Sequence, residues 1–399
     1  MTNKKELELY LHIPFCIQKC KYCDFLSMPA DETARSRYVD MLLQEIKEKA
    51  SDCKGYQAAT VFLGGGTPSL LTDAQISSIM ETLQDYFSFA QGAEITIECN
   101  PGTLDRQKLS SYYKSGINRL SIGLQSAIGR ELRLLGRIHT FQQFEENYGL
   151  AREIGFQNIN VDLISGLPKQ TVRDWEYTLE KVLDLEPEHI SAYSLIIEPE
   201  TPFFFSYGED ELRREQGSHP LYLPEEETER EMYQRTKALL EQRGYRRYEI
   251  SNYAKPGREC RHNTGYWRRV PYLGFGLGSA SFLEETRFSN PSSLGDYLNG
   301  RYVHLSQLLQ SDSFGETDVC KLTKHQQMEE FMFLGLRMEE GVSRCGFREN
   351  FGIDIEEIYK KPLQGFQKQG LLSQKGDAIS LTEEGIAVSN YVLSGFLIS

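Results

Sequence analysis

The chain lacks three features that would each define a class of protein: a long apolar run, an excess of positive charge, and a second pair of metal ligands beside its clustered cysteines. No apolar stretch reaches the ~18 residues that a membrane-spanning helix needs, which excludes a membrane span and leaves contact with a membrane surface open. The 44 Lys and Arg residues against 57 Asp and Glu give a net charge of −13. This balance argues against a nucleic-acid partner held through its phosphates.

Cysteine is sparse, and most of it is scattered. A chain of 399 residues without a signal peptide is unlike the short secreted domains that disulfides hold together. We therefore expect the single cysteines to be buried thiols, and the protein to be cytoplasmic, where thiols stay reduced. Five of the eight cysteines stand singly: Cys53, Cys99, Cys260, Cys320 and Cys345.

The other three cysteines, Cys16, Cys20 and Cys23, are spaced C-x3-C-x2-C directly after a short alternating apolar run. Three thiolates on one loop suit an iron–sulfur cube, because each can bind a different iron. The fourth iron then lacks a protein thiolate and can bind an exchangeable ligand. We predict a [4Fe–4S] cluster on these cysteines, with S-adenosylmethionine on the open iron. The main alternative, a structural zinc site, would need a further Cys or His pair nearby, and none follows.

Strand-like and helical segments alternate through the first half of the chain. The strand-like runs are separated by ~25–50 residues, which fits crossover connections rather than hairpins. This alternation predicts an α/β fold with a parallel sheet and outer helices. Thr171 and Asp174 resemble a capping box that would begin one of these helices. The predicted strands are Leu7–Ile13, Thr60–Leu63, Ile95–Glu98, Arg119–Gly123, Asn158–Leu163 and His189–Leu195.

Residues with chemical functions follow these strands at their carboxyl ends, where parallel sheets place their sites. The cysteines follow the first strand, and Gly64–Thr67 follows the second. Glycine allows the backbone to approach a ligand closely, because no side chain intervenes. We therefore predict one site at this edge of the sheet. Further candidates for it are Glu98, Gln125, Arg137, Asp162 and the segment 193–199.

Two of these candidates have a competing structural explanation. Glu98 precedes Asn100 and Pro101, which look like a turn, so its carboxylate would also suit a cap on the next helix. Arg137 lies in a charged stretch and, taken alone, would be a surface charge. Asp162 is the stronger candidate, since a carboxylate in an otherwise apolar strand is costly without a partner.

The alternating pattern ends after Pro202. Residues 203–224 are polar and irregular, which predicts a long excursion or lid, and a helix is expected over 225–243. From about residue 307, short helices, a two-stranded wing and a last helix predict a winged-helix-like module, for which packing or partner binding is favoured over DNA binding. The predicted domains are 1–202, the α/β core; 203–306, a barrel-completing and lid region; and 307–399, the C-terminal module.

A set of short runs spread over residues 8–390 is specific in combination. The runs are Tyr10–Cys16, Phe62–Pro68, Glu98–Gly102, Asn118–Gln125, Gly136–His139, Asp162–Pro168, His189–Ser194, Tyr248–Asn252 and Cys260–Tyr266. Together they resemble the radical-SAM family of anaerobic coproporphyrinogen III oxidases and, more closely, its HemW branch of heme chaperones. The resemblance implies a partial (β/α)6 barrel with a C-terminal helical and winged-helix-like region.

The resemblance also implies roles for particular residues. It implies S-adenosylmethionine contacts from Tyr10, Gly65 and Glu98. A second ligand set is implied for Gly66, Thr67, Gln125, Arg137 and Asp162. In the HemW branch, heme binding is associated with an H-N-x-x-Y motif, which His262–Tyr266 matches. His262 is thus a candidate heme ligand through its imidazole, and a hydrogen-bonded histidine in a polar loop is the competing explanation.

One departure separates the two branches. The oxidases resemble this chain but carry a further cysteine two residues after the third, whereas Cys23 is followed here by Asp24 and Phe25. They also have an N-terminal extension longer than the 15 residues before Cys16. We therefore expect a heme chaperone that delivers heme to an acceptor protein. The alternatives are an oxygen-independent coproporphyrinogen III oxidase and a radical enzyme acting on heme itself.

Overall fold

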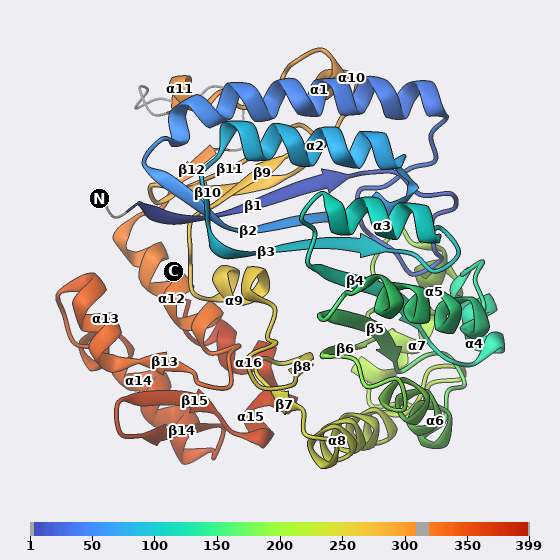
Figure 1. Ribbon diagram of the computed structural model, residues 1–399. Helices are drawn as coiled ribbons and strands as arrows, with labels where there is room; N and C mark the ends of the chain where they lie inside the picture. The colour runs from blue at the N-terminus through green and yellow to red at the C-terminus, as the bar shows by residue number, and fades with distance from the viewer. Residues whose placement is uncertain (1–3, 309–318, 398–399) are drawn as a thin grey trace.

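The computed structural model, which describes residues 4–308 and 319–397, is organised around a large sheet of twelve strands (Figure 1). Its centre consists of six adjacent parallel strands, each within a few residues of a predicted one, so the predicted α/β core is confirmed. These strands are β1 (Lys5–Ile13), β2 (Tyr56–Gly65), β3 (Phe89–Cys99), β4 (Arg119–Gln125), β5 (Ile159–Ser165) and β6 (His189–Ser194).

Helices connect these strands on the outside of the sheet, as Figure 1 shows for α1, α2 and α3. The predicted capping box of α6 is confirmed: Thr171 Oγ1 accepts the Asp174 N–H at 3.2 Å, and Asp174 accepts the Thr171 N–H at 3.0 Å. The helices are α1 (Glu32–Ala50), α2 (Asp73–Tyr86), α3 (Arg106–Lys114), α4 (Gly129–Leu135), α5 (Phe141–Ile154) and α6 (Val172–Leu183).

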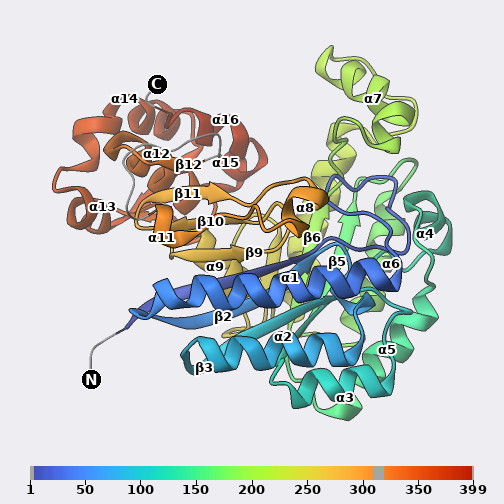
Figure 2. The ribbon, with the colours of Figure 1, turned by 90° about the horizontal axis from the view of Figure 1, so that it is seen from above.

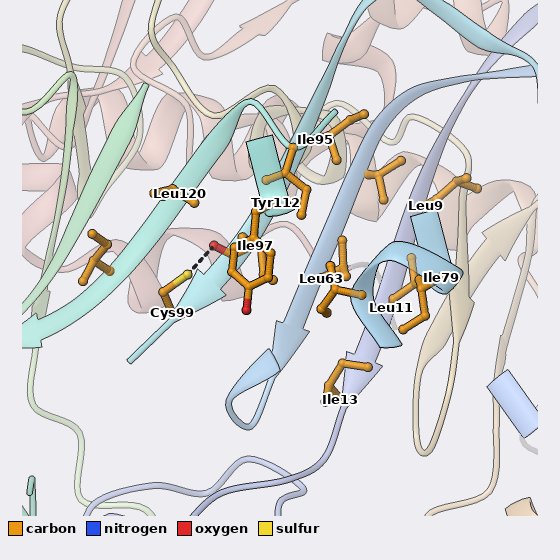
Figure 3. Close-up of a cluster of buried hydrophobic side chains, with 14 of the residues drawn as sticks. Leu9, Leu11, Ile13, Leu63, Ile79, Ile95, Ile97, Cys99, Tyr112 and Leu120 are labelled. Atoms are coloured by element: carbon orange, nitrogen blue, oxygen red, sulfur yellow. Dashed lines mark hydrogen bonds between the residues drawn. The ribbon is translucent and has the colours of Figure 1, made fainter. Parts of the chain in front are cut away.

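The main core lies between the sheet and these helices. Leu9, Leu11 and Ile13 of β1 are fully buried there, with Ile79 of α2 and Tyr112 of α3 (Figure 3). Because side chains alternate along a strand, the intervening residues face the other side of the sheet. The sheet curls around that side, since residues of β1 to β6 line one internal cavity there. This is the partial (β/α)6 barrel that the sequence predicts.

The sheet continues beyond the barrel strands at both edges. On one side, β9 (Tyr272–Phe275) is parallel to β1, and β10 (Ala280–Leu283), β11 (Thr286–Ser289) and β12 (Val319–Lys321) follow antiparallel. On the other, β8 (Asn252–Ala254) pairs antiparallel with β6, and β7 (Arg246–Arg247) pairs antiparallel with β8. β7 ends at Arg247, and just after it the Glu249 carboxylate accepts the Ser251 N–H at 2.9 Å, a local bond that competes with strand pairing.

The segment after Pro202 begins with a helix, so the expectation of an irregular stretch over 203–224 is wrong for its first half. α7 (Pro202–Glu215) is capped by the Thr201 side chain and has Pro202 in its first turn, a favoured place for proline. Residues 216–225 form a loop, and the predicted helix follows as α8 (Glu226–Gln242). Figure 2 shows α7 projecting beyond the barrel, apart from the C-terminal module.

The C-terminal module has its own core and the predicted wing, β14 paired with β15. Three helices of the module precede the wing, and β13 adds a third strand to it. The elements are α12 (Lys324–Gly335), β13 (Val342–Ser343), α13 (Arg344–Phe351), α14 (Ile355–Lys368), β14 (Leu372–Lys375), β15 (Ala378–Leu381), α15 (Glu383–Ala387) and α16 (Ser389–Ser394). Three short helices precede it: α9 (Arg261–Trp267), α10 (Leu294–Leu298) and α11 (Leu305–Leu308).

Two further predictions concern this half of the chain. The boundary at residue 307 stays a prediction: β12, which follows it, belongs to the large sheet, and residues 309–318 lie outside the described part. Cys320 and Cys345 are exposed, so the expectation of buried single cysteines holds only for Cys53, Cys99 and Cys260.

Within the described ranges, no helix is both long and apolar enough to cross a bilayer.

Candidate cofactor site

A cleft of about 380 Å³ opens at the carboxyl ends of β1 to β6. Loops that are distant in sequence form its walls, because the carboxyl ends of parallel strands meet at one edge of the sheet. All the predicted site residues except Tyr10 and His262 line it. They are Cys16, Cys20, Cys23, Gly65, Gly66, Thr67, Glu98, Gln125, Arg137 and Asp162.

The three cysteines lie on the loop between β1 and α1, partly exposed to the cleft. Arg137 Nη1 donates to Cys20 Sγ at 3.6 Å, and Cys16 Sγ lies 3.5 Å from Thr67 Oγ1. The thiolate is the form of cysteine that binds iron. No three His, Cys, Asp or Glu side chains in the described chain form a single-ion site. A cluster does not need one, because each thiolate binds its own iron.

The glycines after β2 bring the second loop against the end of β1. Gly65 has φ +109°, and a Cβ there would lie 2.5 Å from the His12 ring. A Cβ on Gly66 would lie 2.8 Å from the Phe15 carbonyl oxygen. The Gly66 N–H instead donates to the Ile13 carbonyl at 2.9 Å. Both positions therefore require glycine, one for its backbone conformation and both for space.

Replacing Gly65 by alanine is expected to destabilise the fold, because the new methyl group must displace the His12 ring. Gly92→Ala is the matched control: Gly92 also has a positive φ, +70°, but no atom lies within 4 Å of the place that its new methyl group would occupy. The control should cost about 1–2 kcal/mol from the backbone alone. Gly65→Ala should cost about 1–3 kcal/mol more, measured by urea unfolding. Equal losses in the two variants would contradict the close approach of Gly65 to His12.

Glu98 lies at the end of β3 and faces the cleft. Its Oε2 accepts the Gly65 N–H at 3.0 Å, so it joins the second and third loops. The competing explanation of a helix cap is wrong, because α3 is capped by Asp105. Burial, and then the nearby Asp162 carboxylate, raise the pKa of Glu98 to about 8, although the hydrogen bond from the Gly65 N–H lowers it. With this pKa the Glu98 carboxyl group is protonated near neutral pH, so it would have to lose a proton before it could accept a cationic ligand.

Arg137 and Asp162 form the polar wall opposite the glycines. Arg137 Nη2 donates to the Gly123 carbonyl at 2.5 Å and to Asn100 Oδ1 at 2.8 Å, so this arginine is not the surface charge of the competing explanation. Asp162 accepts from Ser121 Oγ and from Asn160 Nδ2, each at 2.9 Å. Burial raises the pKa of Asp162 despite these partners.

Gln125 ends β4 with φ +71°, a backbone conformation that is uncommon for a residue other than glycine. It lines the cleft with Arg137 and Asp162. A strained residue of this kind persists only where the surrounding structure holds it, and such residues cluster at ligand sites. The backbone therefore supports Gln125 as a member of the site.

Tyr10 and His262 lie beneath the cleft, on a separate cavity of about 170 Å³ that shares Glu98 and Asp162 with it. His262 is only 1% exposed. Its Nδ1 lies 2.6 Å from Thr60 Oγ1, and its Nε2 lies 3.0 Å from the Tyr266 hydroxyl. Both ring nitrogens of His262 are thus engaged inside the protein, as in the competing explanation of a hydrogen-bonded histidine.

Several residues at the site were not predicted. Arg119, at the start of β4, is buried beside the same smaller cavity, and its Nε has no hydrogen-bond partner among the described residues. Its positive charge lowers the pKa values of Glu98 and Asp162, against the effect of burial. The signal was present in the sequence, since a charged residue in an apolar strand is costly without partners. Tyr22 and Phe25 supply apolar walls of the cleft, together with Ile196 of the predicted segment 193–199.

Comparisons with known proteins show the family and the fold of the chain. The Radical SAM superfamily model matches residues 10–182, and the HemN C-terminal domain model matches residues 322–388. The chain is 35% identical to the heme chaperone HemW of Bacillus subtilis, over 97% of this chain and 98% of the relative. The chain belongs to the HemW family. The HemW of Escherichia coli is 34% identical over the full length of both chains.

The HemW family fold is close to that of a solved radical-SAM enzyme. Coproporphyrinogen III oxidase (HemN) from Escherichia coli superimposes with a TM-score of 0.81 and 26% sequence identity, covering 99% of this chain and 90% of the enzyme. The likeness thus extends through the barrel and the C-terminal module. The family and the fold that the sequence resemblance implied are both confirmed.

Proposed function

We propose that this protein is a heme chaperone that binds heme, a [4Fe–4S] cluster and S-adenosylmethionine, and that it delivers heme to an acceptor protein. The observation that carries the proposal is the place and exposure of the Phe25 side chain. It stands where the oxidases that the chain resembles carry an additional cysteine, and it lines the cofactor cleft with 66% of its surface exposed. The cleft thus keeps the cysteines and polar residues but presents an apolar ring in place of that thiol. Relatives named as heme chaperones match the whole chain.

The residues of the cleft fit both cofactors. Cys16, Cys20 and Cys23 would hold the cluster, and the Arg137 guanidinium, already bonded to Cys20, would balance its negative charge. Glu98 and Gly65 would hold the methionine end of S-adenosylmethionine with Tyr10 beneath them. When bound, the cluster can supply an electron to that ligand. A second ligand set would come from Gly66, Thr67, Gln125, Arg137 and Asp162.

The affinity for S-adenosylmethionine is expected to rise with pH between 6 and 8. Below its pKa of about 8, Glu98 is protonated, and the proton must leave before the carboxylate can accept an ammonium group. Each pH unit below that value should therefore weaken binding about tenfold. The Glu98→Gln variant should bind S-adenosylmethionine weakly at every pH. Equilibrium dialysis measures the affinity of the unchanged protein and of the variant.

Glu8→Gln is the matched control for this prediction. Burial, and then Glu94, raise the pKa of Glu8 to about 9, but Glu8 does not line the cleft. The control should therefore keep the pH dependence of the unchanged chain. An affinity of the unchanged chain that stays constant from pH 6 to pH 8 would show that Glu98 does not accept the ammonium group.

The second candidate function is the oxidative decarboxylation of coproporphyrinogen III, favoured by the fold shared with the oxidase over 99% of this chain. One anaerobic experiment separates the two: the reconstituted protein is titrated with hemin, and separately incubated with coproporphyrinogen III, S-adenosylmethionine and a reductant. A chaperone should bind one heme per chain and leave coproporphyrinogen III unchanged. Conversion to protoporphyrinogen IX in many turnovers would assign the oxidase function instead.

A further inference from the structure

The loop between α7 and α8 carries an exposed histidine in an arrangement suited to iron. The His219 side chain is 93% exposed, and its Nδ1 lies 2.8 Å from Glu225 Oε1. When Nδ1–H donates to the carboxylate, Nε2 carries the free electron pair. Histidines that bind metals commonly donate their other ring N–H to a carboxylate, which fixes the ring and raises its basicity.

Three buried histidines, His262, His189 and His12, lack this freedom, and the buried His139 is held through Nε2 by the Leu124 carbonyl at 3.2 Å. Both nitrogens of His262 are engaged inside the protein, and His189 lies between Asn160 and the Tyr248 hydroxyl at 2.6 and 2.8 Å. His12 is held by Tyr10 and by the Leu26 carbonyl. An iron-porphyrin could reach these rings only after the barrel opens. His219 can be reached in the fold as it stands.

Residues close to His219 in the loop, and one residue that contacts the loop, are of the types that the other parts of a heme need. Leu221 and Tyr222, both exposed, follow it in the loop and offer an apolar surface for the macrocycle. Lys169 Nζ lies 5.2 Å from the centre of the Tyr222 ring, and the Lys169 N–H donates to the Tyr222 carbonyl at 2.7 Å. An ammonium group at the edge of an apolar surface is suited to a propionate.

The loop is held in place before any ligand arrives. The Asp210 carboxylate of α7 accepts the N–H groups of Leu221, Tyr222 and Leu223 at 2.9, 2.6 and 2.9 Å. A preformed surface loses little conformational entropy on binding. The end of the loop is also close to the cofactor cleft, because Leu223 belongs to one buried cluster with Leu195, which lines that cleft.

We propose that His219 is the axial ligand of heme bound on the 216–225 loop, with Leu221 and Tyr222 against the macrocycle and Lys169 paired with a propionate. This inference rests on the proposed heme-binding function. It names the site, which lies on a different surface from the H-N-x-x-Y motif. Heme transfer would then take place at an exposed loop rather than in the barrel interior.

Hemin titration of the full chain and its variants, followed by the Soret absorption band, tests the inference. His219→Ala should shift the band to that of a weakly ligated heme, and added imidazole should restore it. Glu225→Gln should keep the ligand but weaken hemin binding about tenfold. His304→Ala is the matched control, since His304 is another partly exposed histidine, 3.5 Å from Glu48, and its loss should change nothing.

The outcomes separate the inference from the proposed function. If the unchanged chain binds no hemin, the chaperone function fails. If it binds one hemin and His219→Ala leaves both band and affinity unchanged, only the ligand assignment fails. A band that is lost in His262→Ala but kept in His219→Ala, in a variant whose circular dichroism spectrum is native, would return the ligand role to His262.

Discussion

Replacing Cys16, Cys20 and Cys23 together by alanine is expected to abolish the iron content of the anaerobically reconstituted protein, from about four irons per chain to none. All three thiols lie on one partly exposed loop of the cofactor cleft, and none of them is packed in the main core. The fold should therefore survive the change, so that loss of iron reports on the ligands themselves. Iron analysis and the visible absorption of the cluster measure the result.

The matched control is the double variant Cys320→Ala, Cys345→Ala. These two thiols are also exposed but lie on β12 and α13, outside the cleft. The control should reconstitute as fully as the unchanged chain. If the triple variant still bound about four irons, the assignment of the cluster to this loop would be wrong.

Lys49→Met is expected to produce the largest loss of stability, about 3–5 kcal/mol, because it leaves the Glu45 carboxylate buried without its cation. The two side chains are 1% and 0% exposed and lie 2.5 Å apart on α1. Lys49 also donates to the Gly274 carbonyl at 3.1 Å, and Glu45 accepts the Gly276 N–H at 2.8 Å. The pair thus joins α1 to β9, through Gly274, and to the residue that follows this strand. Urea unfolding measures the loss.

Two further variants test whether the loss of stability comes from the unpaired buried charge. The double variant Glu45→Gln, Lys49→Met should recover part of the loss, since it removes the unpaired charge. Arg301→Gln breaks an exposed ion pair with Asp296 and should change stability by less than about 1 kcal/mol. A Lys49→Met chain as stable as the Arg301→Gln chain would show that the buried pair contributes no net stability.

The barrel and most of its site could be predicted because they depend on local patterns. Each strand of the barrel is a short apolar run followed by a helix, and parallel topology then brings the carboxyl ends of distant strands together. Glu98, Gln125 and Asp162 are far apart in sequence and meet in the cleft for that reason alone. No knowledge of their side-chain contacts was needed.

The features that could not be predicted depend on which way a side chain points and on neighbours that come from distant parts of the sequence. The H-N-x-x-Y motif lies on α9, and only the packed structure shows that His262 points inward against Thr60. The helical start of α7 was obscured by its polar and aromatic composition, although Thr201 and Pro202 form a cap and first turn. Arg119 was missed because its carboxylate neighbours come from other strands.

The Lys21 backbone has a consequence for communication within the molecule. Its N–H donates to the Leu135 carbonyl at the end of α4, and its carbonyl accepts from Phe203 at the start of α7. One residue between Cys20 and Cys23 therefore contacts the ends of two helices. If binding at the cysteine loop changes the affinity of α7 for a ligand, thermodynamic linkage requires that this ligand changes the affinity of the loop by the same factor. The exchange rate of the Phe203 amide hydrogen, in the first turn of α7, should therefore report whether a ligand is bound to the cysteine loop.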